Sequence, residues 1–347
     1  MNFYGNETYK NAIRALFDKL PCEKNGILVT GASGLIGSLI VDTLLFANKE
    51  NGCKFKVYAH GRSKEKLEKR FSYAKGKDIE FIIGDICQPI DGINEIDYII
   101  HGASNADPRS YSLYPAQTLL INVIGAQNVL ELAKKTGAKN TLLLSTFETY
   151  GKIEQSEKYS EEQFGKIDHN MIRACYPESK RCAEILFRCY SEQYGIKTNI
   201  ARLGSVYGPT MAQNDSKAHA QFIRNALNGE DIVLKSEGKP IRSYVSVFDT
   251  VSGIFKVLFE GENGEAYNVS DDNCTASIAQ VANTIAEICS KRVIFDLPDE
   301  IEKKGFSAPQ NSILGGTKLK KLGWRAEYNV KNGLELTIKI LKELSLN

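Results

Sequence analysis

The sequence of 347 residues is poor in histidine and tryptophan, and its charges almost cancel. Forty-four Lys and Arg residues stand against 42 Asp and Glu residues, which leaves a formal net charge of +2. A chain this close to neutrality has no overall field that would favour nucleic acid or an anionic membrane. We therefore expect any anionic ligand to be held by a local site.

Long apolar segments and metal-binding cysteine pairs are also missing. Apolar runs stay below the roughly 20 residues that a membrane-spanning helix needs. The N-terminal segment carries acids, lysines and asparagines where a signal peptide would have an apolar stretch. The eight cysteines include no C-x-x-C pair, which argues against a metal site and against a disulfide framework. These absences predict a cytoplasmic protein that binds no membrane.

Short apolar runs alternate with helical patterns from residue 26 onward. The runs are GILVTG, FKVYAHG, IEFIIGD, IDYIIHGAS, NTLLLST and TNIARLG, and helical segments such as 35–48, 115–136 and 177–194 separate them. Strands that are buried on both faces have this nearly continuous apolar character. The pattern predicts an α/β protein with a doubly wound parallel sheet of the Rossmann type.

The alternation weakens after residue 202, where a loop with Gly and Pro leads into further helical and extended patterns. We expect three parts, an N-terminal helical extension (1–25), a Rossmann dinucleotide-binding domain (26–201) and a smaller C-terminal substrate-binding lobe (202–347). The lobe is expected to be partly interleaved with the Rossmann domain and to close over the carboxyl edge of the sheet.

A glycine-rich turn follows the first predicted strand. Gly31, Gly34 and Gly37 form a G-x-x-G-x-x-G pattern, in which glycines let the backbone approach a pyrophosphate at a helix N-terminus. The preceding strand and the following helix supply the context that this motif requires, so the turn predicts dinucleotide binding. The residues of the turn expected at the cofactor are Gly31, Ser33, Gly34, Leu35, Ile36 and Gly37.

The end of the second predicted strand bears on the choice between NAD and NADP. An acid at this point binds the ribose hydroxyls of NAD, whereas a base accommodates the additional phosphate of NADP. Here His60 stands in place of the acid and Arg62 follows, which leans towards NADP, although Arg62 could also be a solvated residue at a helix start. Asp85, followed by Ile86, ends the third strand and could accept a hydrogen bond from the adenine amino group or simply cap a helix.

Tyr176 and Lys180 form a Y-x-x-x-K pair at the start of a predicted helix, where Pro177 is favoured. A spacing of four residues stacks the two side chains on one helix face. We expect the ammonium of Lys180 to lower the pKa of the phenol from about 10. Tyr176 could then exchange a proton with a sugar hydroxyl while hydride passes to a nicotinamide.

Several motifs together resemble those of the extended short-chain dehydrogenases/reductases, and most closely those of nucleotide-sugar enzymes of the UDP-glucuronate decarboxylase type. The resemblance covers about residues 27–343 and is carried by GASGLIG, GDI, IHGASNADP, LLINVIGAQNVLELAKKTGAK, LLLSTFETYG, RACYPESKR, ARLGSVYGPTM, RSYVSVFD and KLKKLGW. It implies a nucleotide-sugar substrate that is oxidised at carbon 4, with NAD as the cofactor. It also implies a homodimer in which the helices at 115–136 and 177–194 pair across a two-fold axis.

The resemblance further implies roles for individual residues. Thr146 would share the 4-hydroxyl of the sugar with Tyr176, and Glu148 would face carbon 5. Arg242 would hold the anionic part of the substrate, and Asn122 would support the hydrogen bonds of the site. The residues implied to line the cofactor after the fourth strand are His101, Gly102, Ala103 and Ser104, and the further substrate contacts are Asn105, Phe147 and Ser205.

Phe147 bears on the type of reaction. Sugar-nucleotide dehydratases of this superfamily carry an acid at this position, which protonates the departing 6-hydroxyl, and a phenylalanine cannot replace it. Decarboxylation of a 4-keto uronic acid needs no such acid, so a decarboxylase is favoured over a dehydratase; the ring could equally be a packing residue. A 4-epimerase or an NADPH-dependent 4-keto-sugar reductase is the alternative. A non-catalytic dinucleotide sensor is a third possibility, against which the intact Thr-Tyr-Lys set argues.

Overall fold

The computed structural model describes residues 3–74, 76, 78–153, 157–297 and 311–346, so parts of the expected extension (1–2) and lobe (298–310 and 347) lie outside the described residues. The strands are β1 (Lys24–Thr30), β2 (Lys54–Gly61), β3 (Ile79–Ile83), β4 (Tyr98–His101), β5 (Asn140–Thr146), β6 (Thr198–Leu203), β7 (Ser205–Tyr207), β8 (Ile232–Leu234), β9 (Ile241–Ser246), β10 (Ala266–Val269), β11 (Thr275–Ser277) and β12 (Val293–Phe295). The α-helices are α1 (Glu7–Arg14), α2 (Leu35–Glu50), α3 (Lys64–Arg70), α4 (Pro108–Leu113), α5 (Pro115–Thr136), α6 (Cys175–Tyr194), α7 (Ala218–Leu227), α8 (Val247–Glu260), α9 (Ile278–Cys289), α10 (Thr317–Lys321) and α11 (Val330–Ser345). None of the helices in the described part of the chain combines the length and apolar character needed to cross a membrane.

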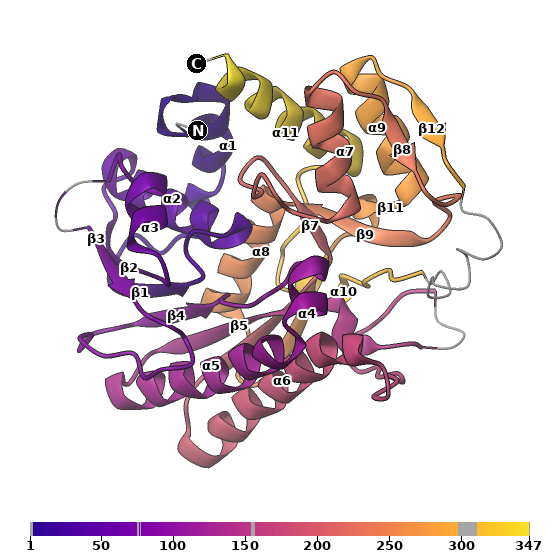
Figure 1. The fold of residues 1–347 in the computed structure, drawn as a ribbon. Helices are drawn as coiled ribbons and strands as arrows, with labels where there is room; N and C mark the ends of the chain where they lie inside the picture. Colours follow the sequence, from indigo (N-terminus) through magenta and orange to yellow (C-terminus); the bar gives the residue numbers. More distant parts are fainter. Residues whose placement is uncertain (1–2, 75, 77, 154–156, 298–310, 347) are drawn as a thin grey trace.

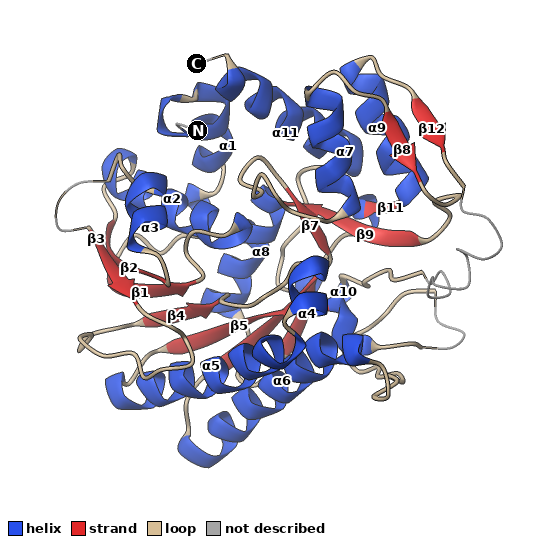
Figure 2. Cartoon of the chain, in the orientation of Figure 1, coloured by secondary structure: helices blue, strands red, loops and turns tan. Residues whose placement is uncertain are grey.

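A parallel sheet lies between two layers of helices (Figures 1 and 2). In the described chain it has seven strands in the order β10-β6-β5-β4-β1-β2-β3, and each neighbouring pair is parallel. Leu28 and Leu143 pack with α5 and α6, whereas Ile27 and Leu142 pack with α2 and α8. The strand order reverses between β1 and β4, which is where sheets of this kind bind their ligands. The predicted doubly wound Rossmann fold is confirmed.

The sequence analysis missed two elements of this sheet layer, α8 and β10. Both come from within the expected lobe, because residues 247–269 return from the lobe to the larger sheet. The apolar stretch RSYVSVFD spans the end of one element and the start of the next. Its residues up to Ser246 belong to β9, and α8 begins at Val247. Ser246 caps that helix by accepting a hydrogen bond from the amide of Phe248 at 3.3 Å.

The smaller lobe has two short sheets. In the described chain these are the three-stranded sheet β11-β9-β7 and the two-stranded sheet β12-β8. The helices α7, α9 and α11 pack with them around a separate apolar cluster. Helix α9 was not expected from the sequence. The division of the chain at residues 25 and 201 stays a prediction.

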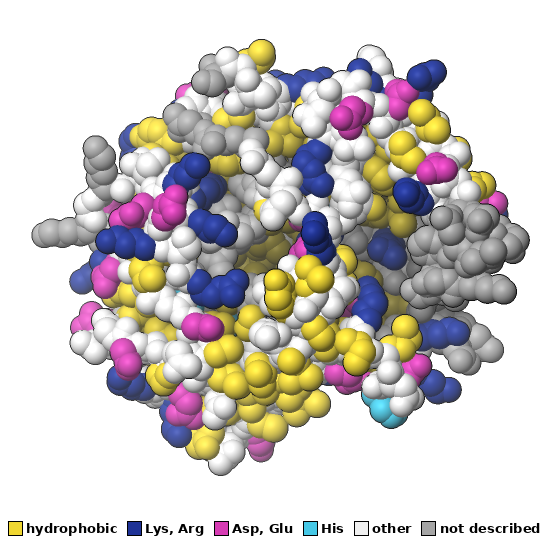
Figure 3. Space-filling view, viewed as in Figure 1, with side chains coloured by type: hydrophobic (Ala, Val, Ile, Leu, Met, Phe, Trp, Pro, Cys, Tyr) yellow, Lys and Arg dark blue, Asp and Glu magenta, His cyan; other side chains and the backbone are white. Residues whose placement is uncertain are grey.

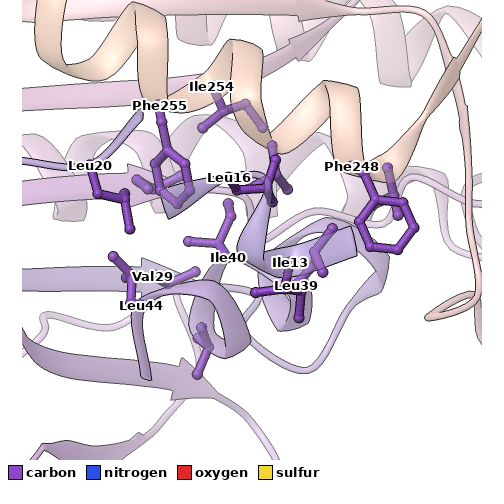
Figure 4. Packing of buried hydrophobic residues seen from close by; sticks show 14 of the residues in the cluster. Ile13, Leu16, Leu20, Val29, Leu39, Ile40, Leu44, Phe248, Ile254 and Phe255 are labelled. Carbon is purple, nitrogen blue, oxygen red and sulfur yellow. The ribbon is translucent and has the colours of Figure 1, made fainter. Parts of the chain in front are cut away.

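The N-terminal extension packs firmly on the sheet layer. Figure 4 shows Ile13 and Leu16 of this extension among side chains from α2 and α8, and these residues are buried. The phenol of Tyr9 donates a hydrogen bond of 2.5 Å to the buried carboxylate of Asp42, which also forms an ion pair with Arg70. The extension is therefore part of the hydrophobic core.

Cys22 and Cys53 form a disulfide bond, with their Cα atoms 4.4 Å apart. The sequence analysis argued against disulfide bonds, and for this pair the expectation is wrong. The register of the sheet places Lys24 beside Lys54, so the residues that precede β1 and β2 also meet. The two cysteines are 31 residues apart, and only the pairing of the strands brings them together.

Candidate active site

The glycine-rich turn between β1 and α2 leaves no room for a side chain at Gly31 or at Gly37. Gly31 has a φ of +71°, and a Cβ atom on it would lie 2.9 Å from the carbonyl oxygen of Gly102. A Cβ atom on Gly37 would lie 2.4 Å from the carbonyl oxygen of Gly31. Glycine is therefore required at both positions, and the backbone stays exposed at the N-terminus of α2.

A cavity of about 230 Å³ opens at the carboxyl ends of β1 to β4. It is lined by Gly31, Ser33, Gly34, His60, Gly61, Arg62, Asp85, Ile86, Gly102, Ala103, Ser104, Asn105 and Ile121. All of these except Gly61 and Ile121 were predicted as cofactor or substrate residues, so the structure brings the predicted set together. The other predicted residues of the turn, Leu35, Ile36 and Gly37, lie in the first turn of α2 and are not among the lining residues.

The two bases at the end of β2 differ in their surroundings. His60 is buried, and burial lowers its pKa, against a smaller raising effect of Asp85. Its Nδ1 atom has no hydrogen-bond partner among the described residues. Arg62 is exposed at the cavity. Asp85 accepts a hydrogen bond of 3.0 Å from the amide of Cys87, as a capping residue does.

Thr30 organises the backbone at the end of β4. Its hydroxyl oxygen accepts hydrogen bonds of 3.1 Å from the amides of Gly102 and Ala103, and it lies 2.8 Å from Nδ1 of His101. Burial lowers the pKa of His101 to about 3, so this ring is neutral. Thr30, which the sequence analysis did not single out, thus holds the segment that closes one side of the cavity.

Thr146, Tyr176 and Lys180 come together at the end of β5. Tyr176 and Lys180 are both buried on α6, and the Thr146 hydroxyl hydrogen-bonds the Tyr176 phenol. Lys180 donates from Nζ to the carbonyl oxygen of Leu144 at 2.9 Å. Burial lowers the pKa of Lys180 to about 8, and the carboxylate of Glu184 opposes this effect.

The protonation of Tyr176 differs from the expectation. Burial raises its pKa well above the ordinary value, and Glu148 raises it further, whereas the hydrogen bond from Thr146 lowers it. The predicted lowering by Lys180 is wrong for this arrangement. A buried phenolate loses its hydration, and the ammonium that was expected to offset this loss donates to Leu144 instead.

Glu148 lies in a group of charged and aromatic side chains around Tyr176. It forms an ion pair with Arg173, with 3.2 Å between Oε2 and Nη2. Arg173 also donates to the phenol oxygen of Tyr111 at 3.3 Å, and the ring of Tyr111 stacks on that of Tyr176. The sequence analysis missed Arg173 although it stands in the motif RACYPESKR. It also missed Tyr111, which no motif marks.

The remaining predicted substrate residues are not among those that line the cavity. Asn122 is buried between α5 and α6 and donates to the hydroxyl of Ser179 at 2.9 Å, so it supports the helix of Tyr176. Phe147 packs against an apolar cluster that includes Tyr150, in agreement with the packing interpretation. Ser205 lies on β7 and Arg242 on the neighbouring strand β9 of the lobe.

A parallel sheet with a glycine-rich turn at its switch point, and a Tyr-Lys pair on a later helix beside a strand-end threonine, define the short-chain dehydrogenase/reductase class. Residues 27–270 match the NAD dependent epimerase/dehydratase family, and the chain belongs to this family. The predicted resemblance is thereby confirmed.

Comparisons with individual proteins agree with this assignment. UDP-glucuronic acid decarboxylase 5 of Arabidopsis thaliana is 33% identical over 324 residues, which cover 91% of this chain and 89% of that protein. A dTDP-glucose 4,6-dehydratase from Bacillus anthracis in complex with NAD has a TM-score of 0.74 at 23% identity, with 92% of this chain and 97% of that chain covered. A UDP-glucuronic acid 4-epimerase variant from Bacillus cereus, solved with NAD and a fluorinated UDP-glucuronic acid, has a TM-score of 0.76 at 22% identity, with coverages of 92% and 99%. The two solved structures share the fold, and both contain NAD.

Proposed function

We propose that this protein is a nucleotide-sugar decarboxylase that oxidises UDP-glucuronate at carbon 4, releases carbon dioxide and reduces the resulting keto-sugar. The observation that carries this proposal is the buried group of Thr146, Tyr176 and Lys180 with Glu148 beside it. The match to a UDP-glucuronic acid decarboxylase, which covers 91% of this chain at 33% identity, supports the choice of reaction.

The residues around the glycine-rich turn fit a nicotinamide dinucleotide. Because a Cβ atom on Gly31 or Gly37 would collide with the backbone of Gly102 or of Gly31, the glycines let this turn pack closely, and the N-terminus of α2 suits a pyrophosphate. Asp85, which also lines the cavity, suits the adenine amino group. When bound, the oxidised cofactor supplies the acceptor for the hydride of carbon 4.

Tyr176 acts as the base in this proposal. The reacting form is the phenolate of Tyr176, which burial disfavours and which the positive charge of a bound oxidised nicotinamide would favour. The phenolate oxygen takes the proton of the 4-hydroxyl, while the hydroxyl of Thr146 orients that group. Oxidation at carbon 4 produces a ketone placed β to the carboxylate on carbon 5. The bond between carbon 5 and the carboxylate then breaks, carbon dioxide leaves, and the electron pair moves to the carbonyl oxygen. Carbon 5 then takes a proton from water as the carbonyl re-forms. The hydride returns to carbon 4, and the phenol of Tyr176 gives its proton to the carbonyl oxygen, which leaves a 4-hydroxyl and the phenolate.

The side chain at position 147 favours this reaction over loss of water. Dehydration needs an acid that protonates a departing hydroxyl, and the ring of Phe147 has no proton to donate. Its packing against the cluster of Tyr150 supports an apolar role beneath the sugar.

Incubation with UDP-glucuronate and a catalytic amount of NAD tests the proposal. We expect carbon dioxide and a UDP-pentose, identified by mass spectrometry, with no net reduction of the cofactor. Tyr176→Phe is the control, and it should abolish both products. Conversion to an isomeric uronic acid without carbon dioxide would identify an epimerase, and steady NADPH consumption with a 4-keto-sugar would identify a reductase.

For the cofactor we propose that NADP is bound as well as NAD. Arg62 is an exposed base at the cavity, and no acid stands at His60, where NAD-selective sites carry one. We expect Arg62→Ala to weaken NADP binding about tenfold, or about 1.4 kcal/mol, and to leave NAD binding unchanged. Equal effects on both cofactors, measured by titration calorimetry, would contradict this role.

We also propose a homodimer formed through α5 and α6. An apolar area lies over these two helices (Figure 3), and Leu119, Leu120 and Ile185 are 41%, 48% and 61% exposed. An exposed apolar area of this kind is typical of an interface. We expect sedimentation as a dimer at micromolar concentration and as a monomer after Ile185→Glu. A monomeric unsubstituted protein would contradict the proposal.

The proposed location is the cytoplasm, where thiols are kept reduced. Cys22 and Cys53 form a disulfide bond in the structure, whereas a cytoplasmic protein would hold them as thiols, so their state in the cell tests this location. We expect both thiols to be alkylated when cells are lysed in the presence of a thiol-trapping reagent. Full protection of the pair would indicate an oxidising compartment.

A further inference from the structure

Arg173 and Glu148 form an ion pair next to the candidate base, and neither side chain takes part in the proton transfers proposed above. Arg173 lies 3.2 Å from Glu148 and donates to Tyr111 at 3.3 Å. Tyr111 is only 2% exposed, and its ring stacks on that of Tyr176 with centroids 5.2 Å apart and 17° between the planes. The stack connects the guanidinium to the phenol through a single buried side chain.

The two charges of this pair act on the phenol in opposite directions. Glu148 raises the pKa of Tyr176 and that of Tyr111, whereas Arg173 lowers both. The side chain of Glu148 is mostly buried, and that of Arg173 is half exposed at the other end of the pair. The charge of the carboxylate is therefore felt at the reacting phenol, and the guanidinium reduces it.

A uronic acid that binds beside Tyr176 brings its own carboxylate close to that of Glu148. Glu148 is expected to face carbon 5, which carries the carboxylate of the sugar, so two like charges would meet in a partly buried site. Like charges that are not compensated disfavour binding. A neutral hexose carries no such charge and would be bound without this repulsion.

We propose that Arg173 is a specificity-determining residue, which neutralises Glu148 and thereby lets the site accept a sugar that carries a carboxylate. This inference rests on the proposed function, since it assigns the acidic class of sugar to the same site. Arg173 acts through Glu148 and is a positioning residue, not a group that reacts.

The test compares an acidic with a neutral ligand. The NAD-loaded protein with Tyr176→Phe, which cannot turn over its ligands, is titrated in a calorimeter with UDP-glucuronate and with UDP-glucose. The ratio of the two dissociation constants measures the preference for the carboxylate. Adding Arg173→Met is expected to reduce this preference about tenfold, or about 1.4 kcal/mol, through weaker binding of UDP-glucuronate alone.

Three further variants in the same background sharpen the test. Arg173→Lys keeps the charge and should keep the preference. Arg173→Met combined with Glu148→Gln removes both charges and should restore the preference to within about twofold. Arg292→Met is the matched control, because it removes another arginine from an ion pair, 2.7 Å from Asp231 and in the lobe, and should change nothing. A melting curve for each variant checks that it is folded. If Arg173→Met does not fold, Arg173→Lys still tests the inference.

The outcomes separate the inference from the proposed function. An unchanged preference after Arg173→Met, or a lost preference after Arg173→Lys, overturns the inference alone. A double variant that stays impaired also overturns it, because Arg173 would then contact the sugar directly. No preference for UDP-glucuronate before any change at Arg173 would refute both the inference and the proposed substrate.

Discussion

Glu184 and Arg202 form a buried ion pair beside the candidate catalytic residues, and removing its negative charge should change both the stability and the activity of the protein. Glu184 on α6 is 5% exposed and accepts hydrogen bonds from the hydroxyl of Ser145 at 2.5 Å and from Nη2 of Arg202 at 2.7 Å. Arg202 also donates to the phenol oxygen of Tyr150 at 3.0 Å. The same carboxylate raises the pKa of Lys180, one helical turn away. Glu184→Gln keeps the shape of this side chain and removes its charge.

The loss of stability follows from leaving Arg202 buried beside a neutral group. Removing one partner of a buried pair costs about 3–5 kcal/mol, and the retained amide keeps the change near the lower value. An unfolding entropy of about 2.1 cal/mol/K per residue gives about 0.7 kcal/mol/K for the 347 residues. A loss of about 3 kcal/mol therefore lowers Tm by about 4 °C.

The same substitution shifts the pH dependence of activity. Lys180 has a pKa near 8, so its ammonium, which donates to the carbonyl oxygen of Leu144, loses its charge as the pH rises through about 8. Because this charged hydrogen bond holds the helix of Tyr176 against β5, kcat should fall over the same range. The carboxylate of Glu184 favours the charged form of Lys180, and removing it lowers that pKa. In Glu184→Gln the fall in kcat should therefore begin at a lower pH.

Scanning calorimetry and a pH profile of kcat measure the two effects. Glu178→Gln is the control, because Glu178 lies on the same helix in a partly exposed pair, 3.6 Å from Arg181. Exposed pairs contribute about 0.2–1 kcal/mol, so this variant should melt within about 1 °C of the unsubstituted protein. If the Tm of Glu184→Gln equalled that of the control, or if the pH dependence of its kcat were unchanged, the assigned role of the buried carboxylate would be refuted.

Two further predictions concern the glycine-rich turn and the N-terminal extension. Gly37→Ala introduces a Cβ atom 2.4 Å from the carbonyl oxygen of Gly31 and should cost about 1–3 kcal/mol of stability; NAD titration should show weaker binding, and unchanged affinity would contradict the tight turn. Asp42→Asn removes the negative charge that pairs with the buried guanidinium of Arg70, and it should lower the free energy of unfolding by about 3 kcal/mol. Denaturation in guanidinium chloride measures this, with Glu50→Gln, from an exposed pair, as the control that should stay near the original value.

Local physical chemistry was sufficient to predict the strands β1 to β6 of the larger sheet and its glycine-rich turn from the sequence. The apolar run NTLLLST forms β5 with the predicted bounds, and the helix predicted at 115–136 is α5. That helix begins at Pro115 and is capped after Thr136 by Gly137, whose φ of +66° suits a residue without a side chain. The glycine-rich turn is also largely local, because Gly31 has a φ of +71° and a Cβ atom on Gly37 would meet the carbonyl oxygen of Gly31; only the carbonyl oxygen of Gly102, beside Gly31, comes from a distant segment. Such features depend on residues that are close in the chain, and periodicity and residue type record them.

Tertiary structure alone decided the features that join distant segments. The return of α8 and β10 to the sheet, and the meeting of Cys22 with Cys53, depend on strand pairing that no local pattern records. The protonation of Tyr176 depends on burial and on the charges of Glu148 and Arg173, which different elements bring to the phenol. The sequence by itself determined which strands, turns and reactive residue types are present. Only the packed chain decided their burial and their neighbours, because solvation and charge interactions depend on distances in space.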